Sequence, residues 1–271
     1  MIIDQNTCTH CGLCLKICSR VLLYGTKDGQ LPNENACVRC GQCQAVCPTG
    51  ALRMESFEIN TGSLCDRSLL PTPASEKMAI LTRRSTRTFQ RKPVDESVLA
   101  DILDAGAYAP SGGNLHPISI VVVQDPAQLD WLRERAWSRL QEKAEQLLNS
   151  EDPVLRGKGR YFASFCAVPS SGSAKDRMLF QAPALLLSVG EPQHLREAAT
   201  TMATMERMVY AHGLGGVYCG FFTNAVNGDP EVQARLGLTG QEEVLLSYAL
   251  GIPKYSYRGI PPRHPLKIKR L

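Results

Sequence analysis

What this 271-residue sequence lacks already excludes several classes of protein. No apolar run reaches the ~18 residues that a membrane span requires, and we find no signal peptide, lipidation site or low-complexity tract. The P-loop, H-E-x-x-H and G-x-S-x-G patterns are also missing, so the enzyme classes that these motifs mark are not indicated. We therefore expect a soluble, cytoplasmic protein.

Cysteine, in contrast, is abundant, and eight of the 11 cysteines lie in two copies of one pattern. The copy at residues 37–48 reads C-x₂-C-x₂-C-x₃-C-P, and each of its cysteines follows a counterpart in residues 8–18 by 29 positions. This internal repeat is typical of iron–sulfur proteins, in which a tight loop supplies three thiolates and the other repeat supplies the fourth. Gly12 and Gly41 occupy equal places in the two loops, where the backbone must pass close to sulfide.

The repeat predicts two [4Fe–4S] clusters, each with three ligands from one loop and one from the other. The first set is Cys8, Cys11, Cys14 and Cys47, and the second is Cys37, Cys40, Cys43 and Cys18. Ser19 stands where the repeat pattern has proline. This small departure does not change the assignment of Cys18 as a ligand. Over about the first 55 residues, the chain resembles the bacterial two-cluster ferredoxins.

Two other interpretations of the cysteines are weaker. Zinc sites also use C-x₂-C pairs, but two zinc knuckles would not need the third and fourth cysteines of each copy. A disulfide scaffold would need an oxidising compartment. Cys65 lies outside both copies, and we interpret it as a plain thiol.

The formal net charge of +4 counts every cysteine as neutral. Two oxidised cubanes with their thiolates would add roughly −4, which brings the protein near neutrality. The excess of lysine and arginine is therefore poor evidence for nucleic acid, and we expect no nucleic-acid partner.

The length is that of about two domains. We expect a ferredoxin-like domain over residues 1–55, a linker over 56–76 and a larger domain over 77–271. Short strands are predicted over 21–24 and 51–54. Beyond them, helices are predicted over 76–83, 95–110, 126–149 and 195–212, strands over 118–123, 183–189 and 243–250, and an irregular, lid-like stretch over 150–178. This mixture, without strict βαβ alternation, predicts an α+β fold.

A basic cluster, R-R-S-T-R at residues 83–87, follows the first helix of the larger domain. Three guanidinium groups and a hydroxyl within one helical end suit a phosphate, because guanidinium donates bidentate, charge-assisted hydrogen bonds. An exposed basic face is the alternative for this cluster alone.

Three later motifs follow this cluster in a fixed order. They are the P-S-x-x-N-x-x-P loop at residues 110–117, a glycine-rich turn from Gly213 to Gly220, and Arg263 after Gly251-Ile-Pro253. In this order the four motifs span nearly all of 77–271 and resemble the nitroreductase family. The resemblance implies FMN as cofactor and a homodimer with the flavin at the subunit interface.

The resemblance also implies a role for each matched residue. Arg83, Ser85 and Arg263 would hold the FMN phosphate, Arg84 would support the ribityl–phosphate end, and Arg87 would face the pyrimidine edge of the ring. Pro110 begins the loop from which Ser111, Gly112 and Asn114 would reach the flavin of the partner subunit. Backbone around Gly220 and Phe221 would lie near flavin N5 and O4.

Some residues depart from the family pattern or stay outside the predicted site. His116 and Ile118 stand where the family often has glutamine and an aromatic residue, so the family's substrates cannot be carried over. Cys219 falls close to the expected flavin, and we interpret it as a small buried hydrophobe. Tyr218 takes the place of the third glycine of a dinucleotide fingerprint, which excludes that motif. We assign no catalytic side chain.

These motifs predict an FMN-dependent oxidoreductase in which the clusters relay single electrons to the flavin. The flavin would reduce a small acceptor: a nitroaromatic, a quinone or an activated double bond. External ferredoxin or NAD(P)H are the candidate donors. Two alternatives remain open, namely a flavin dehydrogenase that passes electrons out through the clusters, and a non-enzymatic carrier or redox sensor.

Overall fold

The computed structural model describes residues 1–24, 35–54, 57, 65–167 and 176–271. The chain divides into two compact units, which we describe separately. The first comprises residues 1–71 together with the loop 111–115, and the second comprises residues 72–110 and 116–271. Among the helices in the described part of the chain, none is long and apolar enough to cross a membrane.

The first unit is built around the two cysteine loops, with little regular structure. Its elements are β1 (Ile2–Ile3), α1 (Leu13–Ile17), α2 (Ser19–Tyr24), α3 (Gln42–Ala45), β2 (Leu52–Arg53) and the 3₁₀ turns η1 (Arg67–Leu69) and η2 (Gly112–Asn114). β1 and β2 pair antiparallel. The predicted strand over 21–24 is wrong, because these residues continue α2. The predicted strand over 51–54 is confirmed in its central two residues.

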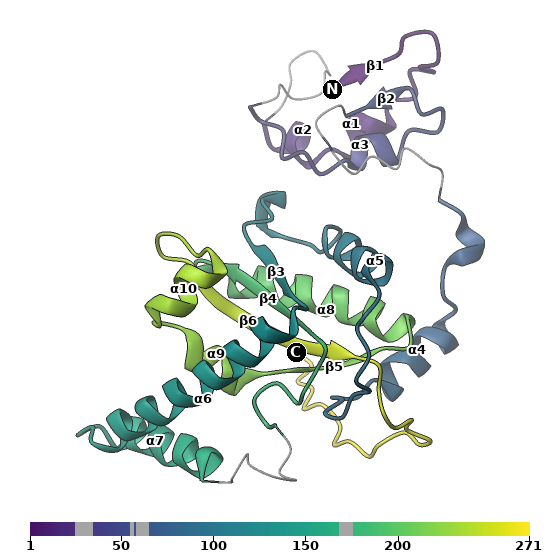
Figure 1. Cartoon of the computed structure of the whole chain (residues 1–271). Helices are drawn as coiled ribbons and strands as arrows, with labels where there is room; N and C mark the ends of the chain where they lie inside the picture. The colour runs from purple at the N-terminus through teal and green to yellow at the C-terminus, as the bar shows by residue number, and fades with distance from the viewer. Residues whose placement is uncertain (25–34, 55–56, 58–64, 168–175) are drawn as a thin grey trace. The chain divides into compact units, whose positions relative to one another are not determined.

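The second unit is organised around a four-stranded antiparallel sheet in the order β3-β4-β6-β5 (Figure 1). Its strands are β3 (Ser119–Val123), β4 (Ala184–Gly190), β5 (Gly215–Tyr218) and β6 (Glu243–Gly251). Its helices are α4 (Pro73–Thr82), α5 (Glu96–Gly106), α6 (Pro126–Leu148), α7 (Pro153–Cys166), α8 (Leu195–Ala211), α9 (Gly220–Val226) and α10 (Pro230–Leu236), with the 3₁₀ turn η3 (Pro192–His194). The predicted α+β fold is confirmed.

Helix starts in this unit follow local capping chemistry. Thr72, Asp95, Asp125, Asp152 and Asp229 each accept a hydrogen bond from a backbone N–H in the first turn of the following helix. Proline follows the cap in α4, α6, α7 and α10. Its fixed φ and its missing N–H suit the first helical position, so these starts are encoded in the sequence.

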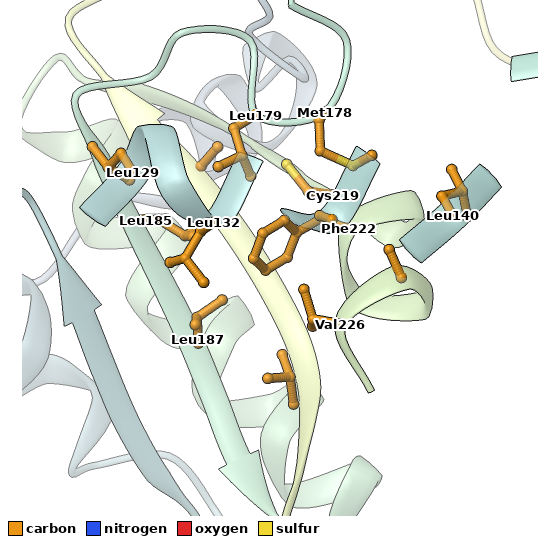
Figure 2. Close-up of a cluster of buried hydrophobic side chains, with 14 of the residues drawn as sticks. Leu129, Leu132, Leu140, Met178, Leu179, Leu185, Leu187, Cys219, Phe222 and Val226 are labelled. Carbon is orange, nitrogen blue, oxygen red and sulfur yellow. The ribbon is translucent and has the colours of Figure 1, made fainter. Parts of the chain in front are cut away.

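The sheet is covered by helices on both faces, and β4 shows why. Every residue of β4 is buried. Leu185, Leu187 and Val189 pack in one core with α6, α7 and α9, whereas Ala184 and Leu186 pack in a second core with α5 and α8. Figure 2 shows the first core, with Phe222 of α9 among leucines of α6 and β4. A strand with two buried faces is apolar along most of its length, and β4 fits this, with Ser188 as its one polar residue.

Helices α9 and α10 were not predicted, and two further elements stand where other structure was expected. Residues 153–166 of the expected irregular stretch form α7, while residues 168–175 lie outside the described residues. Part of the expected glycine-rich turn is the strand β5. Both elements border the candidate cofactor site described below.

Candidate cluster and cofactor sites

The two cysteine loops share one backbone conformation. Gly12 and Gly41 both have φ 70° and both cap a short helix that carries the third cysteine of its loop. His10 and Arg39, which correspond in the repeat, are also left-handed, with φ 53° and 51°. Since non-glycine residues rarely adopt this conformation, its occurrence at the same place in both loops shows that the sequence repeat is a structural repeat.

The eight cysteines of the loops are all free thiols that solvent reaches at least in part. Arg39 donates its backbone N–H to Cys37 Sγ at 3.4 Å. Burial raises the pKa of Cys43. Burial acts in the same direction on Cys47, but the backbone N–H groups of Leu52 and Thr49 outweigh it and lower the Cys47 pKa to about 7. The lowered pKa of Cys47 favours its thiolate form, which is the form that binds iron.

The cysteines do not gather around a single point. Within the described residues, no three side chains of the Cys, His, Asp and Glu types lie together as the ligands of one metal ion would. A cubane does not require this, because each of its four thiolates binds a different iron atom. The assignment of Cys18 and Cys47 to the opposite clusters stays a prediction.

The loop 111–115 belongs to the first unit and holds one of the cysteine loops. Asn114 donates from Nδ2 to the carbonyl oxygen of Arg39 at 3.0 Å. Gly113 and Asn114 both have φ 59°, which glycine and asparagine tolerate better than other residues. The predicted contact of Asn114 with flavin stays a prediction, but its amide already serves the cluster loop.

The basic segment of the second unit runs along the free edge of β5. Arg83 ends α4, and Ser85 then forms a parallel bridge with Gly216. Thr86 donates its N–H to the Gly216 carbonyl at 2.9 Å. This pairing fixes the backbone of residues 85 and 86. The side chains of the flanking Arg84 and Arg87 therefore start from a backbone of fixed position.

The glycines of β5 allow close contacts with Thr86 and with Tyr248 of β6. A Cβ atom on Gly215 would lie 2.3 Å from Thr86 Oγ1, and one on Gly216 would lie 2.3 Å from Tyr248 Cε1. Both distances are far shorter than a van der Waals contact. The glycine-rich sequence therefore allows close packing of a strand edge.

Arg83, the predicted phosphate anchor, forms an ion pair in the structure. Its Nη1 lies 3.2 Å from Glu206 Oε1, with 39% of the Arg83 side chain and 14% of the Glu206 side chain exposed. Two further contacts join α4 to α8: Thr82 Oγ1 lies 2.6 Å from the Tyr210 hydroxyl, and Glu76 pairs with Arg207 at 2.6 Å. Sequence reasoning identified Arg83 but missed Glu206, because nothing in α8 marks that glutamate.

Two tyrosines lie behind this ion pair. Tyr248 donates its hydroxyl to Glu206 Oε1 at 3.4 Å, and its ring packs edge-on against Tyr218 at a centroid distance of 4.8 Å. Burial, followed by the charge of Glu206, raises the pKa of both phenols. Both tyrosines therefore stay protonated and can act as hydrogen-bond donors.

Arg87 and Cys219 lie on the other side of β5. The Arg87 guanidinium lies 5.9 Å from the centroid of the Phe180 ring. Phe180 and Gln181 are both left-handed, and buried Asp176 supports this turn by accepting the N–H groups of Met178, Leu179 and Gln181. Burial raises the pKa of Cys219 to about 12, so this residue stays a neutral thiol.

The remaining predicted flavin contacts lie at the start of α9 and in the C-terminal tail. Gly220 is exposed, and a Cβ atom there would meet no described atom within 4 Å, which leaves room for a flat ring. Phe221 stacks on Phe165 of α7 at a centroid distance of 3.7 Å. Arg263 is exposed and donates to the Pro262 carbonyl at 2.9 Å. Its predicted role at the phosphate stays a prediction.

A hollow of about 470 Å³ lies elsewhere in the second unit, between α6, α7 and α9. Its walls include Lys143, which donates from Nζ to the carbonyl oxygens of Asn224 and Asn227 at 2.7 and 2.6 Å. Lys143 thus satisfies carbonyl groups at the C-terminal end of α9. No predicted cofactor residue lines this hollow.

Comparison with known proteins finds relatives of both parts of the chain. The model described as the nitroreductase family matches residues 80–252. Two models described as 4Fe-4S binding domains match residues 5–25 and 32–53. A curated relative, an NADH dehydrogenase of Thermus thermophilus, is 29% identical over 207 aligned positions, and the match covers 72% of this chain and 93% of the relative.

Solved structures with a similar fold cover the same share of the chain. A nitroreductase with bound FMN from Bacteroides fragilis has a TM-score of 0.53 and 24% identity, covering 72% of this chain and 97% of its own. A nitroreductase with bound FMN from Desulfitobacterium hafniense gives a TM-score of 0.53, 20% identity and the same coverage. A BluB-like flavoprotein from Clostridium difficile gives 0.53 and 18%, covering 72% of this chain and 99% of its own. At these identities the likeness establishes the fold.

Proposed function

The chain belongs to the nitroreductase family, and from this premise we propose that it is an FMN-dependent oxidoreductase whose flavin exchanges electrons with two [4Fe–4S] clusters. Its two ferredoxin-type segments precede the nitroreductase domain in the same chain, as the motifs predicted. When bound, the clusters supply single-electron steps, and FMN supplies the change between single electrons and electron pairs. The covalent link raises the effective concentration of one redox centre near the other.

The observation that carries the proposal is the presence, in one chain, of two matching cysteine loops and a basic segment held at a strand edge. Three arginines and a serine within residues 83–87 offer guanidinium and hydroxyl donors to a phosphate monoester. Arg83 is partly exposed, and only its Nη1 pairs with Glu206. Its other guanidinium N–H groups therefore remain as donors for a ligand. This donor set fits the phosphate of FMN.

The other residues have proposed roles around the flavin. Arg84 supports the ribityl–phosphate end, and Arg87 faces the pyrimidine edge. Arg263 joins the phosphate from the C-terminal tail. The open backbone at Gly220 and Phe221 lies near N5 and O4, in agreement with the free space around Gly220.

We further propose a homodimer in which the loop 110–114 of each subunit serves the partner's flavin. Each flavin would then stabilise the paired state, so FMN binding and dimerisation would be coupled. Sedimentation of the protein with and without FMN measures this coupling. A flavin-loaded monomer would contradict the shared site.

The proposed direction of electron flow is from the clusters to FMN and then to a small acceptor, such as a nitroaromatic, a quinone or an activated double bond. The opposite direction is a second candidate, because the curated relative is described as an NADH dehydrogenase. In that case the flavin would take a hydride from NADH, and the clusters would pass electrons out singly.

Anaerobic reduction of the full-length protein, loaded with iron, sulfide and FMN, separates the two candidates. Reduced ferredoxin, NADH and NADPH are supplied separately while cluster and flavin absorption are followed together. The proposed direction requires that ferredoxin reduces both centres and that the small acceptor then reoxidises them. Steady-state dependence on NADH, with electrons delivered to a one-electron acceptor, would support the second candidate.

The matched control carries Cys11→Ala and Cys40→Ala, which remove a ligand from each cluster and leave the flavin residues intact. Ferredoxin should fail to reduce the flavin in this variant. Absence of flavin turnover in the unsubstituted protein with every acceptor would overturn the enzymatic proposal and support a carrier or sensor.

A further inference from the structure

We propose that Glu206 is a positioning residue of the cofactor site, which orients Arg83 and whose negative charge limits the affinity for the phosphate end of the flavin. This inference rests on the proposed function, which assigns the FMN phosphate to Arg83. It adds a residue of opposite charge to a site that the motifs describe as purely basic.

The first step of the argument is the geometry of Arg83. Its Nη1 lies 3.2 Å from Glu206 Oε1, and its side chain is 39% exposed. A guanidinium group carries five N–H donors, so this contact leaves donors for a second anion. Arg83 can therefore hold Glu206 and a phosphate together, and the carboxylate determines which way the guanidinium points.

The second step is that Glu206 is itself held in place. Tyr248, which is 3% exposed, donates its hydroxyl to Glu206 at 3.4 Å. The α8 helix that carries Glu206 is joined to the C-terminal end of α4 by the contact between Thr82 Oγ1 and the Tyr210 hydroxyl. The carboxylate is thus held beside Arg83 by a group other than Arg83 itself.

The third step concerns charge. A phosphate bound to Arg83 would lie one guanidinium away from a carboxylate that is only 14% exposed. Like charges repel more strongly in a partly buried site than in bulk water. Glu206 therefore orients Arg83 and also lowers the affinity of the site for a phosphate dianion. The affinity for riboflavin, which has no phosphate, is not affected by this charge.

Glu206→Gln separates the two effects, because the amide oxygen still accepts from Arg83 and Tyr248 while the charge is lost. We expect FMN to bind about tenfold more tightly to this variant in the flavin-stripped full-length protein. Riboflavin should bind within about twofold of the unsubstituted protein, since the repulsion acts on the phosphate alone. Quenching of flavin fluorescence measures both affinities.

Salt provides a second measurement. Because dissolved ions screen charges, the ratio of FMN affinities between Glu206→Gln and the unsubstituted protein should fall toward one as KCl rises from 0.05 to about 1 M. A change of packing alone would give a ratio that does not depend on salt.

Glu76→Gln is the matched control, since it removes a carboxylate from the same pair of helices without touching Arg83. It should leave the ratio of FMN to riboflavin affinity unchanged. Equal changes for FMN and riboflavin in Glu206→Gln, weaker FMN binding or a salt-independent ratio would each overturn the inference. Failure of the proposed function is seen separately, as an unsubstituted protein that binds no FMN.

Discussion

At the scale of single residues, Arg83 offers the most direct test of the phosphate site. Replacement by alanine removes charge-assisted hydrogen bonds, each worth about 1.5–3 kcal/mol, so we expect FMN binding to weaken by that amount. Riboflavin should bind Arg83→Ala and the unsubstituted protein alike. The exposed Arg91, which lies beyond the basic segment, supplies the control as Arg91→Ala. An equal loss of riboflavin binding in Arg83→Ala would show a general structural defect.

Asn114 provides a residue-scale test of the loop 111–115. Asn114→Asp keeps the shape and tolerates the left-handed backbone, but it removes the amide donor to the Arg39 carbonyl. We expect the electron paramagnetic resonance signal of the cluster bound by residues 37–43 to change, because its loop loses a support. The signal of the cluster bound by residues 8–14 serves as the internal reference. Identical changes in both signals would contradict this assignment.

Arg83, Ser85 and Glu206 show which residues of a site can be predicted from the sequence. Arg83 and Ser85 were identified because a local motif carries them, and the structure fixes that motif against β5. Glu206 was not, because it occupies a polar position of an amphipathic helix and gains its role only from packing against α4. Contacts between distant segments leave no mark in local sequence patterns.

At the scale of elements, α7 shows why one helix escaped prediction. Gly157 and Gly159 lower its helix propensity, and its sequence is otherwise mixed. Close packing explains the glycine at position 159, because a Cβ atom there would lie 2.7 Å from the backbone nitrogen of Leu148 in α6. The glycine that weakens the helical signal is the one that lets the two helices pack. The Asp152-Pro153 start is a local capping signal for α7 that the prediction did not use.

These two glycines predict opposite effects of the same substitution. Gly159→Ala should lower the free energy of unfolding by about 1–3 kcal/mol, because the methyl group must displace the backbone of α6. At Gly157 the new methyl group would meet only Arg160 Nη2 at 4.0 Å. Gly157→Ala should therefore stabilise the protein by up to about 1 kcal/mol through helix propensity. Thermal unfolding compares the two, and destabilisation by both would contradict the packing argument.

β5 escaped prediction for a related reason. Its Gly215 and Gly216 have low strand propensity and resemble a turn, yet both are buried and paired with β6. β4, whose residues are all apolar or small, was predicted within one residue at each end. Burial on both faces gives β4 a run of apolar residues that can be recognised in the sequence. The glycines of β5, which allow close contacts, give no such hydrophobic pattern.

At the scale of the whole molecule, the crossed ligand sets of the two clusters can be tested by composition and by one substitution. We expect about eight iron and eight sulfide per chain, together with one FMN. Cys47→Ala should disturb the cluster of the first loop more than that of its own loop, because the fourth ligand crosses between repeats. Iron analysis and magnetic resonance measure this. Zinc, or about four iron, in the anaerobically purified protein would contradict the assignment.

Cys65→Ala is the matched control for Cys47→Ala. Cys65 is an exposed cysteine outside both repeats, so its loss should leave the iron content unchanged. A fall in iron after Cys65→Ala would mean that the ligand sets read from the repeat are incomplete.

The pairing of residues 85 and 86 with β5 has a consequence for self-association. A sheet edge with unpaired N–H and C=O groups can recruit a strand from another molecule, and proteins prevent this by covering such edges. Here the cover is the segment that carries the guanidinium groups. Substitutions at Ser85 or Thr86 therefore act on two properties together, ligand recognition and resistance to aggregation, and selection on either one constrains the other.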